Sequence, residues 1–237
     1  MKNGSILITG VYLATQENNV RGIIEEFGKS LDWKIVQKWI SIGGTCDDLL
    51  VRGVTINNVG LPSSKFENLN KVLSAEQLDA YEFIIVSDDD IYVPSGFLDK
   101  YMSIVVKRDL ALAQPARTHN SYIDHHFVEQ LDGLEARRTR FVEIGPLFSV
   151  RRDLFPVIFP LDEDAYMGWG CDFVWPCLVE SLGKRMGIVD ATPIEHSMRK
   201  PVKNYAYDDA NRAMGKYLAK RHHLSKDEAF RILESYT

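Results

Sequence analysis

The chain alternates between apolar runs typical of strands and stretches whose apolar residues recur at helical spacing. Residues 16–30 and 64–78 show the helical spacing, and Ser74 with Gln77 matches a capping box inside the second stretch. Strand-like runs separated by helices predict an α/β fold, with a three-layer α/β/α sandwich around a mostly parallel central sheet. The strand-like runs are 6–9, 33–42, 83–87, 111–114, 141–150 and 187–190.

Two segments interrupt this alternation. Residues 57–64 are rich in Asn, Gly, Pro and Ser, and residues 118–140 mix His, Asp, Glu and Arg with little apolar periodicity. Both patterns predict surface loops, and the second segment is long enough to form a lid.

The last part of the chain has a helical pattern of its own. After Pro201 an apolar stripe recurs at helical spacing, and Ser225 with Glu228 predicts the start of a final helix. We therefore expect a main domain over residues 1–200 and a C-terminal helical extension over 201–237. This extension is expected to pack on the main domain, and its helices are candidates for a homodimer contact. The stripe is Ala210, Ala213, Met214, Tyr217 and Leu218.

Composition narrows the class of protein. With 237 residues and 45% hydrophobic residues, the chain can bury one core. Its 28 Lys and Arg against 33 Asp and Glu give a net charge of −5, which argues against a nucleic-acid partner. Three cysteines match no disulfide framework. Since no segment is long and apolar enough to span a membrane, we expect a cytoplasmic protein, with a peripheral position at the inner face of the membrane as the alternative.

Three consecutive carboxylates follow the strand-like run 83–87. In an extended chain Asp88 and Asp90 point to one side and Asp89 points away. Two such charges repel by about 1 kcal/mol in water and about 4 kcal/mol near a protein surface, and a divalent cation would reverse this repulsion. Oxygen ligands favour magnesium or manganese. The alternative is a solvated acidic turn.

A second group of candidates lies between residues 168 and 196. Trp169 stands between two glycines and could present its indole to a sugar. Asp172 comes where a helical apolar pattern begins, so it is either a functional carboxylate or only a helix cap. His196 follows the run 187–190 and could supply a nitrogen ligand to the same cation, or lie on the surface.

Taken together, these segments resemble GT-A glycosyltransferases. The closer resemblance is to an uncharacterised, glycosyltransferase-like family of DUF707 type. It covers about residues 60–200 and leaves the helices after Pro201 outside. The matching motifs are the acidic motif Asp88–Asp90, the Phe-Val-Glu strand of residues 141–149, the Gly-Trp-Gly-x-Asp-Phe motif of 168–173, the Gly-Ile-Val-Asp strand of 187–190, and His196.

The resemblance implies roles for these residues. Asp90 would coordinate the metal directly, Asp88 would reach the ribose or a metal-bound water, and His196 would be a further protein ligand. Asp172 would take the proton from an acceptor hydroxyl, as in inverting enzymes. Glu143 would hydrogen-bond a sugar hydroxyl, or be a buried acid paired with Arg138 or Arg140. The acceptor or donor sugar would lie on the Gly168, Trp169 and Gly170 motif.

The nucleotide is expected at the first strand and before the acidic motif. Thr9, Gly10 and Tyr12 are candidates on the first strand, together with Asp89 in the acidic motif. Lys65 and Asn68 are candidates to meet the base or phosphate, and a solvated helix face is the alternative. A basic patch of Arg199, Lys200 and Lys203 could clamp the diphosphate, or be a solvated loop.

These features predict a metal-dependent glycosyltransferase that uses manganese or magnesium. The donor would be a nucleoside-diphosphate sugar, with a UDP-sugar expected, and the acceptor a hydroxyl of a glycan, polysaccharide or glycolipid precursor, with inversion. One alternative is a nucleotidyltransferase of related fold, although residues 10–15 lack the Gly-rich, Arg- and Lys-bearing phosphate loop of that class. Another is a non-catalytic nucleotide- or sugar-binding protein.

Overall fold

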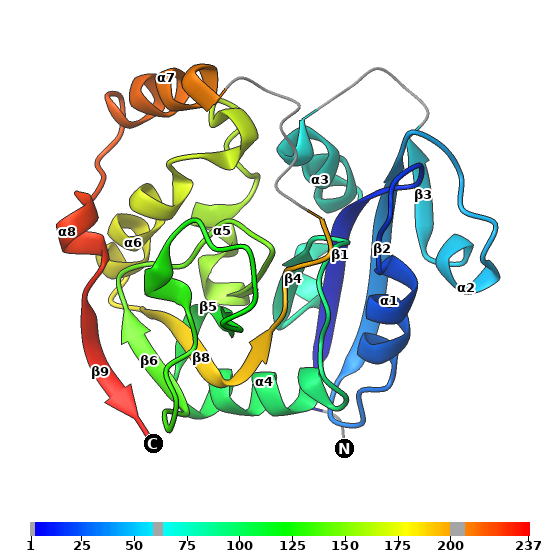
Figure 1. The fold of residues 1–237 in the computed structure, drawn as a ribbon, viewed down its shortest axis with the longest axis horizontal. Coiled ribbons are helices and arrows are strands. Elements are labelled where there is room, and N and C mark those ends of the chain that lie inside the picture. The colour runs from blue at the N-terminus through cyan, green and yellow to red at the C-terminus, as the bar shows by residue number, and fades with distance from the viewer. Residues whose placement is uncertain (1–2, 59–63, 200–206) are drawn as a thin grey trace.

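The computed structural model describes residues 3–58, 64–199 and 207–237. The nine strands in these residues form one sheet (Figure 1). The strand order is β3-β2-β1-β4-β7-β5-β8-β6-β9. Only β6 and β7 run against the other strands, so the sheet is mostly parallel, as predicted. The strands are β1 (Ser5–Leu13), β2 (Lys34–Ile42), β3 (Thr55–Asn58), β4 (Phe83–Ser87), β5 (Leu110–Arg117), β6 (Ala136–Thr139), β7 (Leu147–Arg151), β8 (Arg185–Ile194) and β9 (Ile232–Tyr236).

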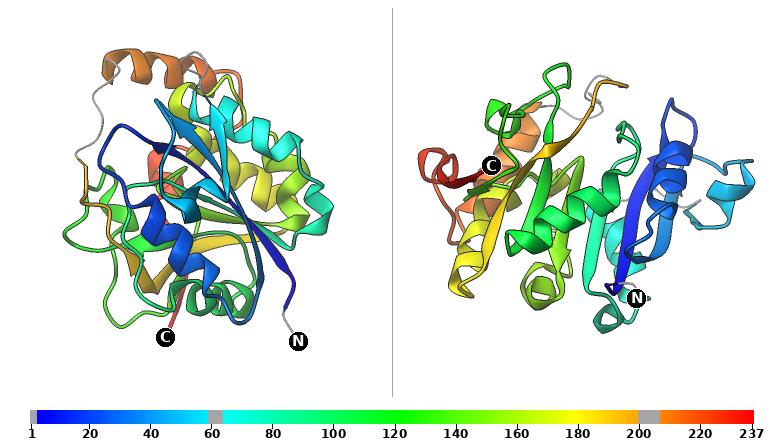
Figure 2. Two further views of the ribbon diagram at one scale, coloured as in Figure 1. Left: turned by 90° about the vertical axis from the view of Figure 1, so that its right-hand side faces the viewer. Right: turned by 90° about the horizontal axis from the view of Figure 1, so that it is seen from below.

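Helices cover both faces of the sheet, which confirms the three-layer sandwich (Figure 2). Because side chains alternate along a strand, Ile6 and Ile8 of β1 pack with α1 and α4, while Leu7 packs with α3, α5 and α6 on the other face. The helices are α1 (Val20–Gly28), α2 (Leu49–Arg52), α3 (Lys65–Ser74), α4 (Phe97–Lys107), α5 (Phe155–Ile158), α6 (Cys171–Ser181), α7 (Tyr207–Leu218) and α8 (Lys226–Ala229).

The start of α3 differs from the prediction. Ser64 caps this helix, its hydroxyl accepting the Glu67 N–H at 3.2 Å while the Glu67 carboxylate accepts the Ser64 N–H at 2.7 Å. The capping box predicted at Ser74 and Gln77 is wrong, because Ser74 is the last residue of the helix. The helix therefore begins at Lys65, which lies in its first turn.

The predicted loop 118–140 contains a strand that its charges concealed. Within β6, Arg137 is 2% exposed and its Nη2 lies 3.0 Å from Oδ1 of Asp190 on β8. The charge of Arg137 is therefore neutralised inside the protein, a pairing that a local polar pattern does not reveal. Conversely, the predicted strand 141–150 is extended only from Leu147, and residues 141–146 form the loop before β7.

The C-terminal segment is more than a helical extension. The predicted Ser225–Glu228 capping box is present at α8, but the chain then forms β9, which pairs antiparallel with β6 at the edge of the sheet. The Leu224 N–H donates to the Phe173 carbonyl oxygen at 3.0 Å, which ties the segment to α6. The segment thus packs on its own chain, and the homodimer remains a prediction.

Among the described residues, no helix combines the length and the hydropathy required to cross a lipid bilayer.

Candidate active site

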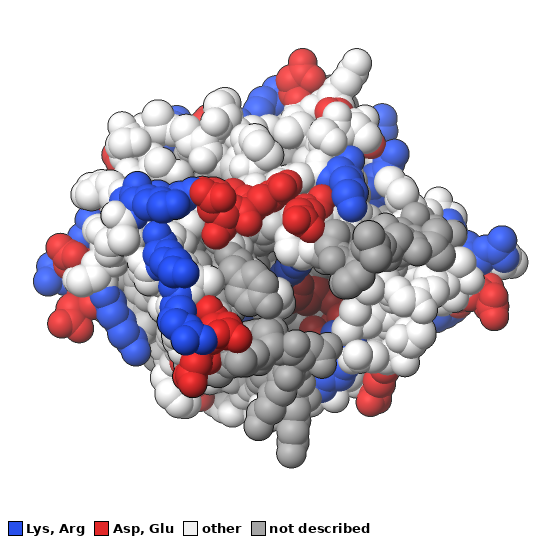
Figure 3. All heavy atoms as spheres, turned by 90° about the horizontal axis from the view of Figure 1, so that it is seen from above, with Lys and Arg blue, Asp and Glu red and all other residues white. Residues whose placement is uncertain are grey.

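A cavity of about 670 Å³ opens at the edge of the sheet where the parallel strands have their carboxyl ends. Ligands bind at this edge in open α/β sheets, and the volume is typical of ligand pockets. Figure 3 looks onto this edge and shows it hollowed, with Asp and Glu side chains inside the hollow. Many of the predicted site residues line one cavity, namely Lys65, Asp88, Glu143, Trp169, Gly170, Asp172 and His196.

The acidic motif begins where β4 ends. The chain bends at Asp89 and Asp90, so strand alternation does not continue through the motif. Asp88 forms an ion pair with Lys65, whereas Asp89 and Asp90 both contact the guanidinium of Arg199. The prediction that Asp89 points away from Asp90 is therefore wrong, because the bend turns both carboxylates toward one arginine.

Asp90 meets His196 although the two are distant in the sequence. Backbone hydrogen bonds between Tyr92 and Glu195, of 2.8 and 3.1 Å, join the end of the acidic loop to the residue before His196. His196 Nε2 consequently lies 3.2 Å from Asp90 Oδ1. Burial acts to raise the pKa of Asp90, but His196 and Arg199 outweigh it and lower that pKa to about 2.

The spacing of this pair is compatible with a divalent cation, whereas its hydrogen bonding is not yet that of a metal ligand: Arg117 can only donate to His196 Nδ1, which leaves the proton of the neutral ring on Nε2. Two adjacent ligands of an octahedral magnesium or manganese ion, each at about 2.1 Å, lie about 3 Å apart, which agrees with the 3.2 Å between Asp90 Oδ1 and His196 Nε2. The described residues contain no cluster of three or more His, Cys, Asp and Glu side chains arranged for a metal. The pair would therefore leave most coordination positions to water and phosphate oxygens, as these ions commonly do.

Asp172 lies in the first turn of α6 and is 8% exposed. The cap of this helix is Gly170, at φ 96°, so the interpretation of Asp172 as the cap is wrong. Its Oδ1 has no hydrogen-bond partner among the described residues. Burial raises the pKa of Asp172 to about 7, and the charge of Glu143 adds to the rise. A carboxyl with this pKa can accept a proton near neutral pH.

Arg117 is a site residue that the sequence analysis missed. It is 5% exposed, and its Nη2 donates to Glu143 Oε2 at 2.5 Å and to the Gly145 carbonyl at 2.7 Å, while Nη1 contacts His196 Nδ1 at 3.2 Å. Its position as the last residue of β5, at the carboxyl edge of the sheet, is the signal that would have found it.

Glu143 is a buried acid, but the arginines predicted to pair with it are wrong. Arg138 forms an ion pair with Glu234, and Arg140 forms one with Glu180; both pairs lie on the outside of the sheet. Glu143 forms its ion pair with Arg117. Side chains alternate along β6, which turns Arg138 away from the interior. Burial raises the pKa of Glu143 to about 7, and the charge of Arg117 opposes this rise.

The two glycines around Trp169 have different structural roles. Gly168 is buried at φ 82°, where a Cβ would lie 2.5 Å from the Ile144 side chain and 2.7 Å from the Phe66 ring. It is therefore required for packing. Gly170, by contrast, lines the cavity with Trp169 and lies under α7.

Several residues predicted to contact the nucleotide are buried in the structure, and their contact with a nucleotide stays a prediction. Thr9, Tyr12 and Asn68 are at most 1% exposed, and the Tyr12 hydroxyl hydrogen-bonds Thr55 at 3.3 Å. At Gly10 a Cβ would collide with the Ser87 carbonyl and the Trp39 ring, so this glycine allows close packing of strands. Among the described residues that line the cavity, none of these four occurs.

Asp89 and the basic patch complete the predicted set. Asp89 is 3% exposed and accepts the Leu13 N–H at 2.8 Å, so it anchors the end of β1 and does not face the cavity. Its contact with the nucleotide stays a prediction. Arg199 lies beside it, whereas Lys200 and Lys203 fall outside the described residues.

The C-terminal segment forms one wall of the cavity, which the sequence did not predict. Asn211, Met214 and Leu218 of α7 line it, followed by residues 223–226. A Cβ on Gly170 would lie 3.0 Å from the Tyr217 ring and 3.2 Å from Leu218 and Met214, so α7 packs closely against the glycine.

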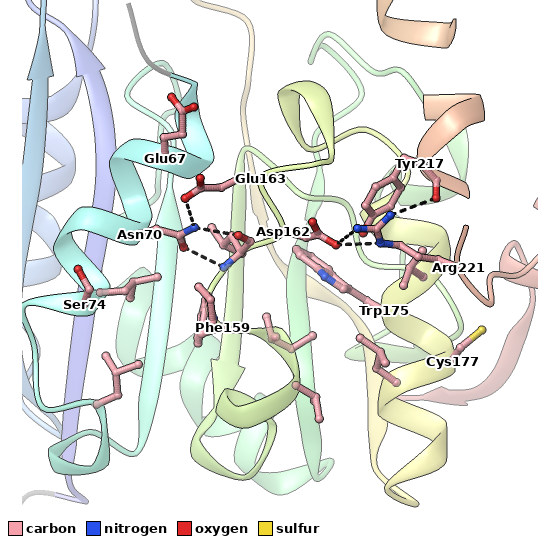
Figure 4. A pocket seen from close by; sticks show the side chains of 18 of the residues that line it. Glu67, Asn70, Ser74, Phe159, Asp162, Glu163, Trp175, Cys177, Tyr217 and Arg221 are labelled. Carbon is pink, nitrogen blue, oxygen red and sulfur yellow. Dashed lines mark hydrogen bonds and ion pairs between the residues drawn. The ribbon is translucent and has the colours of Figure 1, made fainter. Parts of the chain in front are cut away.

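A second, larger cavity of about 1340 Å³ lies between α3 and α6 (Figure 4). Its floor is apolar and includes Phe159 and Trp175. The polar groups at its rim already bind one another: Asn70 Nδ2 donates to Glu163 at 2.8 Å, and Arg221 Nη2 lies 2.6 Å from Asp162. No predicted catalytic or metal residue lines it, so we place the candidate active site in the first cavity.

Several solved structures with a similar fold are those of glycosyltransferases. The mannosyltransferase PcManGT from Pyrobaculum calidifontis, in complex with GDP-Man and Mn²⁺, is 13% identical, with a TM-score of 0.56 over 94% of this chain and 66% of that one. TarS 1-349 of S. aureus, in complex with UDP-GlcNAc, is 10% identical, with a TM-score of 0.53 over 90% and 71%. GalNAc-T7 with UDP, GalNAc and Mn²⁺ is 12% identical, with a TM-score of 0.51 over 85% and 46%.

The fold defined by the sheet and by these matches is that of GT-A glycosyltransferases. The chain spans less than half of the GalNAc-T7 chain. A sequence comparison with curated proteins finds no match. The model of the family described as protein of unknown function (DUF707) matches residues 63–232, well over half of the chain, so the chain belongs to that family. Since the match reaches residue 232, the expectation that the helices after Pro201 lie outside the resemblance is wrong.

Proposed function

We propose that this protein is a metal-dependent glycosyltransferase that moves a sugar from a nucleoside-diphosphate donor, with a UDP-sugar expected, to a hydroxyl acceptor of a glycan, polysaccharide or glycolipid precursor. The observation that carries the proposal is one cavity that holds both His196, which touches Asp90, and the buried Asp172, whose Oδ1 has no hydrogen-bond partner among the described residues. The GT-A fold supports this reading, and the PcManGT and GalNAc-T7 structures contain Mn²⁺ with GDP-Man or UDP.

Asp90 and His196 would hold the cation, manganese or magnesium. When bound, the cation supplies neutralisation of the negative charge that develops on the leaving diphosphate. Asp88 lines the same cavity and forms an ion pair with Lys65; it would meet a ribose hydroxyl or a metal-bound water. Lys65 would place a positive charge beside the donor phosphates.

Asp172 would act as the general base of an inverting transfer. Its carboxylate would accept the proton of an acceptor hydroxyl while that oxygen attacks the anomeric carbon of the donor sugar. General-base assistance of this kind is worth about 10² to 10⁴ in rate. The low polarity around the buried carboxyl strengthens it as a base.

Trp169 and Gly170 would bind a sugar. The indole lines the cavity close to Asp172 in sequence and in space, and aromatic faces stack well on the apolar face of a pyranose. Since Arg117 holds Oε2 of Glu143, only Oε1 of that carboxyl remains for a sugar hydroxyl.

The test is a screen of nucleotide sugars, each with Mn²⁺ and candidate hydroxyl acceptors, scored by released nucleoside diphosphate. We expect one donor to be turned over with Mn²⁺ and not in the presence of a chelator. Tight, chelator-insensitive binding of a nucleotide sugar without any turnover would instead indicate a non-catalytic binding protein. Release of pyrophosphate from a nucleoside triphosphate would indicate a nucleotidyltransferase.

A further inference from the structure

Glu143 is a buried residue whose side chain and backbone are both held by hydrogen bonds. Two residues of β5 fix it: the Gln114 Oε1 accepts the Glu143 backbone N–H at 2.5 Å, and Arg117 Nη2 donates to Oε2 at 2.5 Å. The carboxyl is 7% exposed. An ionised group buried to this extent is stable only with a charged partner, and Arg117 supplies that partner.

Asp172 lies on the neighbouring segment of the same cavity. The Phe141 and Phe173 rings, which flank Glu143 and Asp172 in the sequence, pack with their centroids 5.6 Å apart. This contact holds the loop before β7 against the first turn of α6. Glu143 and Asp172 both line the cavity.

We propose that Glu143, fixed by Arg117 and Gln114, is a positioning residue whose negative charge strengthens Asp172 as a proton acceptor. The inference rests on the proposed role of Asp172 as the base. Burial raises the pKa of both carboxyls to about 7, but the charge of Arg117 opposes this rise at Glu143, so Glu143 loses its proton first and Asp172 then titrates beside a negative charge. A pKa of about 7 at Asp172, with burial as the main cause and Glu143 as the next, agrees with this order.

Other charged groups face the cavity and set the background of this titration. Asp124 and His125 come from the loop after β5, and Lys226 from the start of α8. Burial and the charge of Lys226 lower the pKa of His125. The complete set of cavity-lining groups around the two carboxyls is Lys65, Asp88, Arg117, Asp124, His125, His196, His223 and Lys226.

The test is a pH titration of the Asp and Glu side-chain carboxyl carbons by ¹³C NMR in the free protein, with Asp172→Asn used to assign the Asp172 signal. In Glu143→Gln, which keeps the hydrogen bond to Arg117 but removes the charge, we expect the Asp172 midpoint to fall by about one to two pH units. Glu143→Asp retains the charge and is expected to restore most of the wild-type midpoint.

The matched control is Asp124→Asn. Asp124 also lines the cavity, but it is exposed and is not among the main causes of the Asp172 shift, so its removal should leave the midpoint almost unchanged. An unchanged Asp172 midpoint in Glu143→Gln, or an equal fall in Asp124→Asn, would overturn the proposal.

A second measurement keeps the proposal testable if Glu143→Gln does not fold. Since Glu143 loses its proton while Asp172 is still neutral, Asp172→Asn, in which the neighbour is always neutral, should leave the Glu143 midpoint almost unchanged. A Glu143 midpoint that falls by about one pH unit in Asp172→Asn would show that Asp172 ionises first and would overturn the proposal. Since these readouts need no turnover, their failure is distinct from failure of the proposed function, which the donor screen measures.

Discussion

His196 Nε2 lies 3.2 Å from Asp90 Oδ1, although one residue follows β4 and the other follows β8. The backbone hydrogen bonds between Tyr92 and Glu195 join these two segments. A cation would therefore bind between two residues that folding has already brought together, so its binding free energy would not be reduced by the cost of ordering two loops.

Removal of the imidazole should weaken cation-dependent nucleotide binding. In His196→Ala we expect the Mn²⁺-dependent part of UDP or GDP affinity to fall by about tenfold or more, because one protein ligand is lost. Binding without Mn²⁺ should change little. Isothermal titration calorimetry with and without Mn²⁺ measures both nucleotide affinities. His126→Ala is the control, since His126 is exposed and outside the cavity; equal losses in the two variants would contradict the assignment.

Loss of the base should reduce turnover without loss of the nucleotide site. In Asp172→Asn we expect kcat to fall by about 10² to 10⁴, because the amide cannot accept the acceptor proton. The affinity for nucleoside diphosphate should stay within about twofold. Steady-state kinetics and calorimetry on the same preparation check this pair of outcomes. Turnover at the wild-type level would leave Asp172 with a structural role only.

The raised pKa of Asp172 predicts the pH dependence of the rate. A base works only when it has lost its proton, and burial, followed by Glu143, raises this pKa to about 7. The rate should therefore rise about tenfold per pH unit below pH 7 and level off above it. An Asp with an ordinary pKa would place this limb near pH 4. Initial rates from pH 5 to 9 at saturating Mn²⁺ provide the measurement, and a flat profile from pH 5 to 7 would exclude Asp172 as the base.

Arg199 should contribute to stability through two buried carboxylates. Its guanidinium contacts Asp89 and lies 3.0 Å from Asp90 Oδ2. Arg199→Ala leaves both acids without this partner, so we expect the free energy of unfolding at pH 7 to fall by about 3 to 5 kcal/mol. Arg212→Ala, which breaks an exposed pair with Asp209, should cost under about 1 kcal/mol. Denaturant unfolding of both variants checks the difference, and similar losses would show that burial has no effect here.

Gly170 should control how closely α7 packs on the cavity. An alanine there places a methyl group 3.0 Å from Tyr217 at φ 96°, so we expect a loss of about 2 to 4 kcal/mol from strain and displaced packing. Gly96→Ala has φ 71° but no atom within 4 Å of the new methyl group, so it should cost only about 1 kcal/mol. Thermal unfolding separates the two, and an equal shift would mean that α7 does not press on Gly170.

Local patterns predicted the elements with buried apolar faces. The run 83–87 coincides with β4, and the capping box at Ser225 coincides with the start of α8. Both signals come from residues close together in the chain, where side-chain alternation and cap hydrogen bonds act. Residues with distant charged partners were misread, and Arg137 in β6 is the example, since Asp190 on β8 is what allows its burial.

The sequence by itself determined the fold class, because the apolar periodicity of strands and helices is a local property of the chain. It also marked the acidic motif after β4, Asp172 and His196 as candidate site residues, because their side chains are chemically distinctive. The tertiary structure alone decided that Asp89 and Asp90 share Arg199, that Arg117 holds Glu143, that Thr9 and Tyr12 are buried, and that α7 closes the cavity. These outcomes depend on which strand ends meet at one edge of the sheet and on how much water each side chain loses, and both are properties of the packed molecule.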